Sequence, residues 1–350
     1  MFSIIVPVYN RPDEVDELLE SLCSQTMKDF EVVIVEDGSE KTCKDVCDKY
    51  ADILVLHYYY KENSGPGQSR NYGAERAQGE WLIILDSDVV LPPDYMQAVE
   101  KSLHIPHSTF HTSTACFGGP DAAHPSFTPV QKAISYSMTS FFTTGGIRGG
   151  KKKLDKFYPR SFNMGIRKDV YLQLGGFSKM RFGEDIDFSY RIVEAGHQPQ
   201  LFPDAWVWHK RRTDFRKFFR QVYNSGIARI NLEKRHPGTM KLVHLLPMVF
   251  TVGVIAMILI SAVGRVLMHY DDVHRWYWLC AAPWLPILLY SLVILIDSTI
   301  QNKSLKVGLL SVPAAFVQLM GYGFGFIEAW WKRCVRKQDE FTAFEKNFYK

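Results

Sequence analysis

Two aspartates one residue apart, Asp86 and Asp88, follow directly on an apolar run at residues 81–85. A short apolar run of this kind is typical of a buried strand. Two carboxylates at its end either form a solvated turn before Pro92 and Pro93 or belong to a site. If they belong to a site, the chemistry they suit is holding a hard divalent cation against a phosphate group.

A second group of acids, Glu184, Asp185 and Asp187, lies within the segment GEDIDF. Carboxylates this close raise one another's pKa unless each has a partner, and a carboxylate can serve as a general base. The structural alternative is the acidic first turn of a helix, predicted to begin near Ile186, where the charges complement the helix dipole. That alternative suits Asp187 better than Asp185.

The first 105 residues must supply the elements that position these acids. Strands are predicted at residues 2–8, 30–35, 53–58 and 81–85, and helical patterns occupy the intervals, including 41–50 and 69–77. This alternation predicts a mostly parallel sheet with helices on both faces. Three strands end on polar residues: Asn10, Asp37, and Asp86 with Asp88. Because such sheets bind ligands beyond the carboxyl ends of their strands, these ends predict one site.

Four segments together resemble the family 2 glycosyltransferases with a GT-A fold, in their membrane-attached bacterial form. They are IIVPVYNRPDEVDELLESL, VIVEDGS, NSGPGQSRNYGAERAQGEWLIILDSDVVLPPDY and GGFSKMRFGEDIDFSYRI. Each is a weak signal alone, since DxD occurs by chance in many loops, but all four in this order are specific. The resemblance covers roughly residues 1–230 by motif. It implies a Rossmann-like, mostly parallel α/β domain that uses a nucleotide-diphosphate sugar.

The resemblance also implies roles on the donor side, where a UDP-sugar is favoured and a GDP-sugar is the alternative. Asp37 would accept a hydrogen bond from the base. Asp88 would hold Mg²⁺ or Mn²⁺, while Asp86 would contact the ribose or orient the metal's water shell. Arg70 would reach the diphosphate, or else form a structural salt bridge with nearby acids. The other residues expected to bind the donor are Pro7, Val8, Tyr9, Asn10, Asn63, Gly65 and Ser87.

The family's ED motif maps onto Glu184 and Asp185, and Asp185 takes the role of base there. One base without a carboxylate nucleophile fits a single in-line displacement with inversion. His209 lies where some relatives carry a metal-binding or phosphate-side histidine; a packed core histidine is an equal alternative. The residues expected on the acceptor side are Asn163, Gly165, Gly176 and Phe177.

Residues 206–241 hold ten Lys or Arg and two acids. Within this segment, apolar residues recur at helical spacing over 214–231, with Asp214 as N-cap. A basic amphipathic helix of this kind is expected to lie on an anionic bilayer surface; an ordinary helix covering the core is the alternative. Because apolar segments follow, we expect membrane lipid as the partner and no nucleic acid.

Three uncharged runs follow, at residues 245–264, 276–296 and 307–327. Each has about the 20 residues that a membrane-spanning helix needs. Three full crossings would place the basic segment 332–337 on the side opposite the N-terminal domain, against the positive-inside tendency. Either the third run, interrupted by Pro313 and several glycines, is re-entrant, or the chain breaks that rule.

The predicted organisation is a catalytic GT-A domain at residues 1–205, a basic interfacial segment at 206–241, a membrane region at 242–331 and a tail at 332–350. The nucleotide-binding half of the domain is 1–105 and the acceptor half 106–205, which contains a predicted mobile loop at 143–153. Six cysteines without a disulfide or zinc pattern indicate a reducing compartment, and the chain starts on a strand rather than a signal peptide. We therefore expect the catalytic domain on the cytoplasmic face of a bacterial inner membrane.

The expected activity is transfer of one sugar to a lipid-linked or membrane-proximal glycan acceptor in cell-surface glycan and polysaccharide synthesis. A processive polysaccharide synthase is the first alternative, but no QxxRW motif follows at Gln221. A catalytically inactive, membrane-anchored nucleotide-sugar-binding module is the second, and the intact acids speak against it. The lack of P-loop, GxSxG and GxGxxG motifs argues against NTPase, hydrolase and dehydrogenase functions.

Overall fold

The computed structural model describes residues 1–104, 114–145, 157–270 and 276–343. The chain forms two compact units, one of Met1–Pro125 with Asp155–Lys210 and one of Ser126–Leu154 with Arg211–Phe348. This division differs from the predicted one, because Ser126–Leu154 lies within the predicted acceptor half yet belongs with the C-terminal helices.

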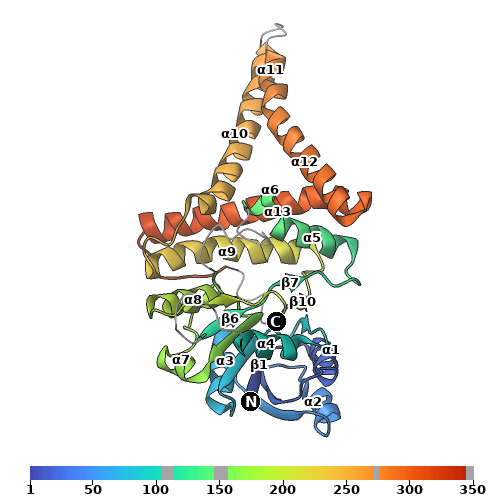
Figure 1. Ribbon diagram of the computed structural model, residues 1–350. Helices are drawn as coiled ribbons and strands as arrows, with labels where there is room; N and C mark the ends of the chain where they lie inside the picture. Colours follow the sequence, from blue (N-terminus) through green and yellow to red (C-terminus); the bar gives the residue numbers. More distant parts are fainter. Residues whose placement is uncertain (105–113, 146–156, 271–275, 344–350) are drawn as a thin grey trace. The chain divides into compact units, whose positions relative to one another are not determined.

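The first unit is built on a seven-stranded sheet of order β3-β2-β1-β4-β8-β6-β9 (Figure 1). Its parallel part consists of β1 (Phe2–Val8), β2 (Phe30–Asp37), β3 (Val55–Lys61) and β4 (Trp81–Leu85). The remaining strands are β8 (Asn163–Arg167), antiparallel to both neighbours, β6 (Cys116–Gly118) and β9 (Gln200–Leu201). The predicted mostly parallel α/β sheet is confirmed.

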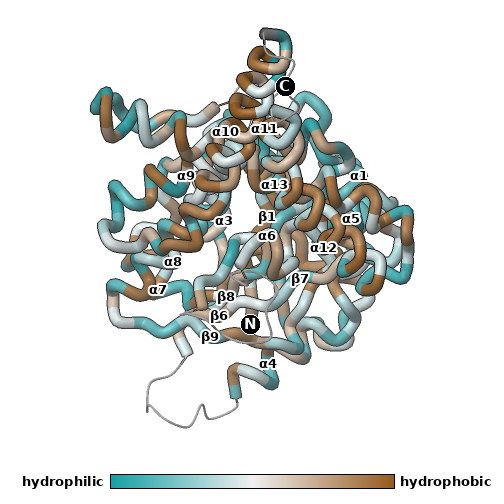
Figure 2. The backbone as a smooth tube through the Cα atoms, turned by 90° about the horizontal axis from the view of Figure 1, so that it is seen from above, coloured by the Kyte–Doolittle hydropathy of each residue, from teal (hydrophilic) through white to brown (hydrophobic). Residues whose placement is uncertain are grey.

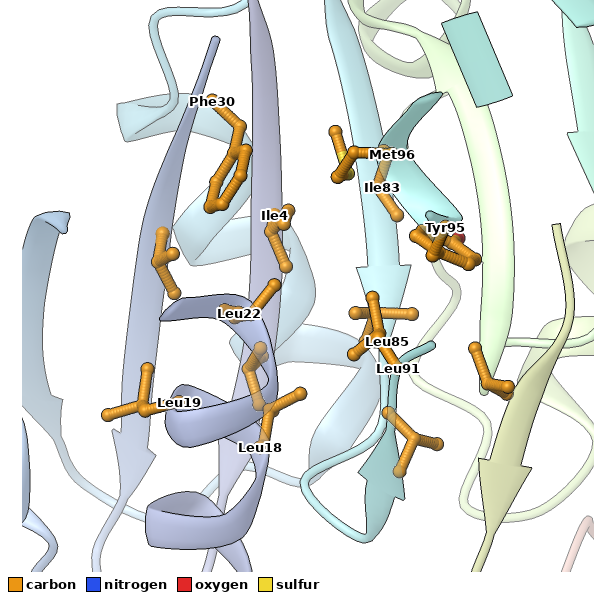
Figure 3. Packing of buried hydrophobic residues seen from close by; sticks show 14 of the residues in the cluster. Ile4, Leu18, Leu19, Leu22, Phe30, Ile83, Leu85, Leu91, Tyr95 and Met96 are labelled. Carbon is orange, nitrogen blue, oxygen red and sulfur yellow. The ribbon is translucent and has the colours of Figure 1, made fainter. Parts of the chain in front are cut away.

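Strand side chains alternate between two cores, as the pleat requires. On β1, Ile4 and Val6 enter one core, and Ile5 enters the other. The first core is covered by α1 (Pro12–Cys23), α2 (Lys44–Tyr50) and α4 (Tyr95–His104). The second is covered by α3 (Pro66–Arg76), α7 (Lys168–Gln173) and α8 (Glu184–Glu194). Figure 3 shows α1 in the first core, with Leu18, Leu19 and Leu22 packed beside Ile4.

A second, three-stranded sheet of order β5-β10-β7 lies in the same unit. It consists of β5 (Val89–Val90), β7 (Asp121–Ala122) and β10 (Val207–His209). The antiparallel pairing of β10 with β5 sets His209 opposite Val89, and Lys210 N–H donates to the Asp88 carbonyl at 3.0 Å. This pairing brings His209 next to the LDSD turn at residues 85–88, more than a hundred positions earlier in the chain.

The second unit is helical. It contains α5 (Pro129–Thr139), α6 (Phe141–Thr144), α9 (Phe215–Arg235), α10 (Leu242–Tyr270), α11 (Tyr277–Ala281), α12 (Leu285–Asn302) and α13 (Leu305–Trp330). Three helical stretches are long and apolar enough to cross a membrane, at Leu242–His269, Tyr277–Asn302 and Leu305–Val335. Figure 2 colours long parts of these helices as hydrophobic.

Several element boundaries differ from the predictions. The third strand begins two residues later than expected, the helix predicted near Ile186 begins at Glu184, and α9 extends to Arg235. The predicted loop at 143–153 starts inside α6, and its residues from 146 onward lie outside the described residues. The apolar face of α9 packs on α5 and α13 in the second unit, so the alternative of a helix covered by protein holds for that face.

Candidate active site

The polar strand ends meet where the order of the parallel strands reverses. β2 and β3 lie on one side of β1, and β4 lies on the other, so the chain leaves β1 and β4 in opposite directions and opens a crevice there. Asn10 follows β1, Asp37 ends β2, and Asp86 follows β4. The three residues that the sequence grouped into one site therefore belong to one edge of one sheet.

Asp86, Asp88 and His209 form a cluster that could hold a metal ion, with one ligand atom from each lying within 4.8 Å of the others. His209 Nε2 lies 3.2 Å from Asp88 Oδ1, and its Nδ1 lies 3.9 Å from Asp121 Oδ2. The imidazole stacks on Phe162 with ring centroids 4.9 Å apart, which fixes its orientation.

The chemistry of this donor set fits a divalent cation. Carboxylate oxygens suit Mg²⁺ and Mn²⁺, and an imidazole nitrogen is accepted by transition metals more readily than by Mg²⁺. The His209 side chain is 17% exposed and its Nε2 faces Asp88, while its ring packs on Phe162; its role as a metal ligand stays a prediction. The structure thus brings together the three predicted metal ligands, from the β4–β5 turn and from β10.

Arg70 joins the two groups of acids. It lies on α3 with its side chain 4% exposed, and it donates through Nη2 to Asp86 Oδ1 at 2.6 Å and through Nη1 to Glu184 Oε1 at 3.1 Å. Its guanidinium also lies over the Phe177 ring, 5.2 Å from the centroid. Of the two roles the sequence left open, the structure shows the salt bridge with neighbouring acids.

Glu184 and Asp185 begin α8 after Gly183, whose φ of 85° turns the chain into the helix. Burial raises the pKa of Glu184 to about 7, with a smaller upward contribution from Asp185 that Arg70 partly offsets. Burial is the largest single effect on Asp185 and would raise its pKa, but Arg160, Arg70 and the Ile186 N–H together lower this pKa. The close spacing predicted that each carboxylate raises the pKa of the other. In the structure only the pKa of Glu184 is raised.

No motif in the sequence pointed to Arg160, which is the closest partner of Asp185. Its Nε donates to Asp185 Oδ2 at 2.5 Å, and its side chain is 37% exposed. It lies in an irregular segment without a motif, and an isolated Arg there resembles any surface Arg. Asp187, by contrast, pairs with Arg191 at 3.1 Å on its own helix, in keeping with the structural role expected for it.

Asp37 is almost fully buried and already has several partners. Its Oδ1 accepts from Lys61 Nζ at 2.5 Å and Ser64 N–H at 2.9 Å, and its Oδ2 accepts from Gly65 N–H at 2.9 Å. Asn63 Nδ2 donates to the Asp37 carbonyl at 2.9 Å. Asp37 therefore braces the loop after β3, a role that the sequence did not predict.

The other predicted donor residues lie at the same edge. Asn10 takes a positive φ of 54°, and its N–H donates to Ser39 Oγ at 2.7 Å, which ties the loop after β1 to the loop after β2. The rest are Pro7, Val8 and Tyr9 at the end of β1 and Ser87 inside the LDSD turn. Their contact with a donor stays a prediction.

The four residues predicted on the acceptor side are buried. Asn163 bonds to the Tyr95 hydroxyl and the Ala205 carbonyl, and the backbone of Gly165 makes room for the Phe117 ring. Gly176 and Phe177 pack around Asn71, which accepts from the Phe177 N–H at 2.8 Å. The contact of these residues with an acceptor stays a prediction.

The fold and the cluster at its switch point define an α/β ligand-binding domain with a candidate metal centre. Residues 3–172, just under half of the chain, match the model of the family described as "Glycosyl transferase family 2". An uncharacterized glycosyltransferase of Haemophilus influenzae is 31% identical over 210 residues, covering 58% of this chain and 64% of that protein.

Two further proteins are similar to this chain. Validoxylamine A glucosyltransferase of Streptomyces hygroscopicus subsp. jinggangensis is 27% identical over 229 residues, covering 59% of this chain and 54% of the relative. A mannosyltransferase of Pyrobaculum calidifontis, solved with GDP-Man and Mn²⁺, has a TM-score of 0.57 at 14% sequence identity. The superposition covers 95% of this chain and 87% of the mannosyltransferase chain. The chain thus spans between half and two thirds of these curated relatives, and the solved structure supports the fold.

Proposed function

We propose that this protein is an inverting glycosyltransferase that depends on a divalent cation and moves one sugar from a nucleotide-diphosphate sugar to a lipid-linked or membrane-proximal acceptor. The observation that carries the proposal is the link between two acid groups: Arg70 joins Asp86 of the candidate metal cluster to Glu184, the neighbour of Asp185. This link supports a donor site and a base that act together, in a domain that matches a glycosyl transferase family.

Asp88, Asp86 and His209 would hold Mg²⁺ or Mn²⁺, and a bound cation would supply the positive charge that offsets the negative charge of the departing diphosphate. Asp185 accepts the proton of the acceptor hydroxyl. The acceptor oxygen forms a bond to the anomeric carbon as the bond from that carbon to the phosphate oxygen breaks, and the nucleoside diphosphate leaves. Glu184, held by Arg70, positions the start of α8 and hence Asp185.

The donor and its surroundings follow from the same site. Asp37 would accept from the base N–H, with uracil favoured and guanine as the alternative, and such contact has to displace Lys61 from the carboxylate. The long apolar helices of the second unit favour an acceptor held at a membrane. The corresponding location is the cytoplasmic face of a bacterial inner membrane, and the product class is a cell-surface glycan.

The test is replacement of Asp185 by Asn in the full chain. A general base contributes about 10²–10⁴-fold to the rate, so D185N should lose transfer by that factor while binding of the nucleotide sugar, measured by calorimetry with Mn²⁺, changes less than about twofold. The control is Asp187→Asn, whose side chain pairs with Arg191 on its own helix.

Two outcomes would contradict the proposal. Loss of both binding and transfer in D185N would assign Asp185 a structural role. A ladder of products on a defined acceptor, instead of a single added sugar, would favour a processive synthase.

A further inference from the structure

The third long apolar helix, α13, differs from the other two in how much of it is buried. In its most apolar window 44% of the residues are buried, against 11% for the stretch containing α10 and 6% for that containing α12. The N-terminal half of α13 packs on α5, where Val307 and Ala314 meet Ala133. Its C-terminal half packs on α9, where Phe326 meets Ile227 and Ile230.

The packing of α13 on α9 is close along the backbone. A Cβ added to Gly325 would lie 2.0 Å from the Tyr223 carbonyl oxygen, and one added to Gly226 would lie 2.1 Å from the Tyr322 carbonyl oxygen. The Tyr223 hydroxyl also donates to Glu328. Glycine at both contact points lets the two helices approach more closely than larger residues allow, so α13 and α9 must share one position relative to a membrane.

Neither α9 nor α5 can lie inside a bilayer. α9 carries six Lys or Arg and one Glu over Phe215–Arg235, and each charge costs about 2.5–3.5 kcal/mol at the bilayer centre on insertion scales. α5 has 11 residues, well short of the roughly 20 that a crossing needs. The helix that packs along both of them therefore stays outside the hydrocarbon core.

α10 and α12 form a hairpin that departs from α13 (Figure 1). At its base, Thr251 lies beside Gly323 and Thr299 beside Gly308. At its far end, Trp284 Nε1 donates to Ser261 Oγ at 2.9 Å. With 29 residues, α10 is about 44 Å long, enough to cross a hydrocarbon core of about 30 Å.

We propose that the chain crosses the bilayer twice, by α10 and by α11–α12, and that α13 lies with α9 and α5 at the headgroup surface on the side of the first unit. The exposed Trp330 and Trp331 at the end of α13 suit an interfacial position. Two crossings return the chain to its starting side, so the basic segment 332–337 lies on the side of the first unit. The conflict with the positive-inside tendency, which three crossings create, disappears.

Three native cysteines that are not fully buried test this topology without substitution. Cys23 marks the first unit, Cys280 lies in α11 near the far end of the hairpin, and Cys334 lies just beyond α13. A membrane-impermeant maleimide is applied to right-side-out and inverted vesicles from cells that produce the full chain, and labelled peptides are identified by mass. We expect Cys23 and Cys334 to be labelled in vesicles of the same orientation. Cys280 should be labelled only in vesicles of the opposite orientation.

Labelling of Cys334 in the vesicles that leave Cys23 unlabelled would overturn the proposal in favour of three crossings. If the native thiols react too slowly, the exposed positions Lys44 and Lys337 provide the substitutions Lys44→Cys and Lys337→Cys. The same comparison then applies, with same-side labelling supporting two crossings and opposite-side labelling supporting three. Neither result depends on the proposed transferase activity.

A cavity in the second unit carries an independent inference. It has a volume of about 680 Å³ and is lined mainly by apolar side chains of α9, α10 and α13, among them Ile230, Met248, Phe326 and Trp330. Glu233 also lines it, but that carboxylate accepts from the Gly238 N–H at 2.8 Å and the Met240 N–H at 2.7 Å.

The remaining charge on the lining is Lys234, which is exposed and forms no ion pair within the described part of the chain. An apolar interior with one cation at its mouth is complementary to an amphiphile with an anionic head. We infer that this cavity binds one anionic phospholipid, with an acyl chain inside and the phosphate beside Lys234.

Native mass spectrometry of the detergent-solubilised chain with added phosphatidylglycerol or phosphatidylcholine tests this site. We expect the wild type to retain phosphatidylglycerol at least about threefold more than phosphatidylcholine, K234Q to lose this preference, and M248W to lose the lipid because the indole fills the cavity. Lys306→Gln, at the other end of α13, should keep the preference. Equal retention of both lipids by the wild type, or equal behaviour of K234Q and K306Q, would overturn the inference.

Discussion

At Asp185 two opposing effects act on one carboxylate. Burial favours its neutral form, whereas Arg160, with Arg70 and the Ile186 N–H, favours its charged form, and together these partners prevail. At the neighbouring Glu184, Arg70 offsets the effect of burial only in part, and the pKa rises to about 7. A base must be ionised to accept a proton, so the two candidates predict different acid limbs for the pH dependence of kcat/KM. With Asp185 as base, activity should persist well below pH 7.

Replacing Arg160 by Gln should move that acid limb upward. Without the guanidinium, the effect of burial on Asp185 is opposed by fewer partners, and we expect its pKa to rise. The measurement is kcat/KM against pH for wild type and R160Q, with Arg167→Gln as control because Arg167 pairs with the exposed Asp169. A wild-type limb near pH 7 that disappears in E184Q would transfer the role of base to Glu184.

The candidate metal cluster makes a second prediction at this scale. A ligand that binds only the folded state stabilises it by about 2.7 kcal/mol at a hundred times its Kd. We expect the matching nucleotide sugar to raise the melting temperature only when Mg²⁺ or Mn²⁺ is present, and D88N to lose the shift. Asp94→Asn, an exposed acid six residues further on, should behave as wild type. A shift that persists in D88N would exclude Asp88 as a ligand.

Among the elements, the contact between α9 and α13 depends on glycines that the sequence only suggested as interruptions of an apolar run. Gly325→Ala would press a methyl group against the Tyr223 carbonyl at 2.0 Å, and overpacking of this kind costs about 1–3 kcal/mol. Gly253→Ala on α10 is the matched control, since nothing lies within 4 Å of its added Cβ. We expect G325A to melt lower than wild type in detergent and G253A to melt no lower. Equal melting of both variants would show that the helices separate freely.

For the whole molecule, the boundary between the two units leads to a prediction about truncation. A chain ended at residue 205, the predicted domain boundary, would keep α5 but lose its partners. Ile134 and Met138 pack on Phe218 and Val222 of α9. We expect this truncated chain to aggregate and to bind a hydrophobic dye, and the double variant Ile134→Asn with Met138→Gln to aggregate less. A soluble, monomeric 1–205 chain that binds no dye would show that α5 does not need the other helices of the second unit.

The sequence by itself determined the mostly parallel α/β sheet and the grouping of polar residues at its strand ends. The reason is local: strand and helix periodicity set the order of the elements, and the LDSD and GEDIDF segments carry their chemistry within a few residues. The pairing of acids with partners remote in sequence was not accessible in this way. Arg160 has no motif, and the Lys61 bond to Asp37 depends on the pairing of β2 with β3.

Tertiary structure alone decided which apolar helix is covered by protein. All three runs have the composition of a membrane span, because composition reports only the cost of exposing a helix to water. Whether lipid or another helix covers the apolar surface depends on what packs against the helix. For α13 it is α5 and α9, which lie far from it in the chain and meet it through Ala133 and Gly226. Ser126–Leu154 belongs to the second unit for the same reason, because its contacts are with helices distant in the chain.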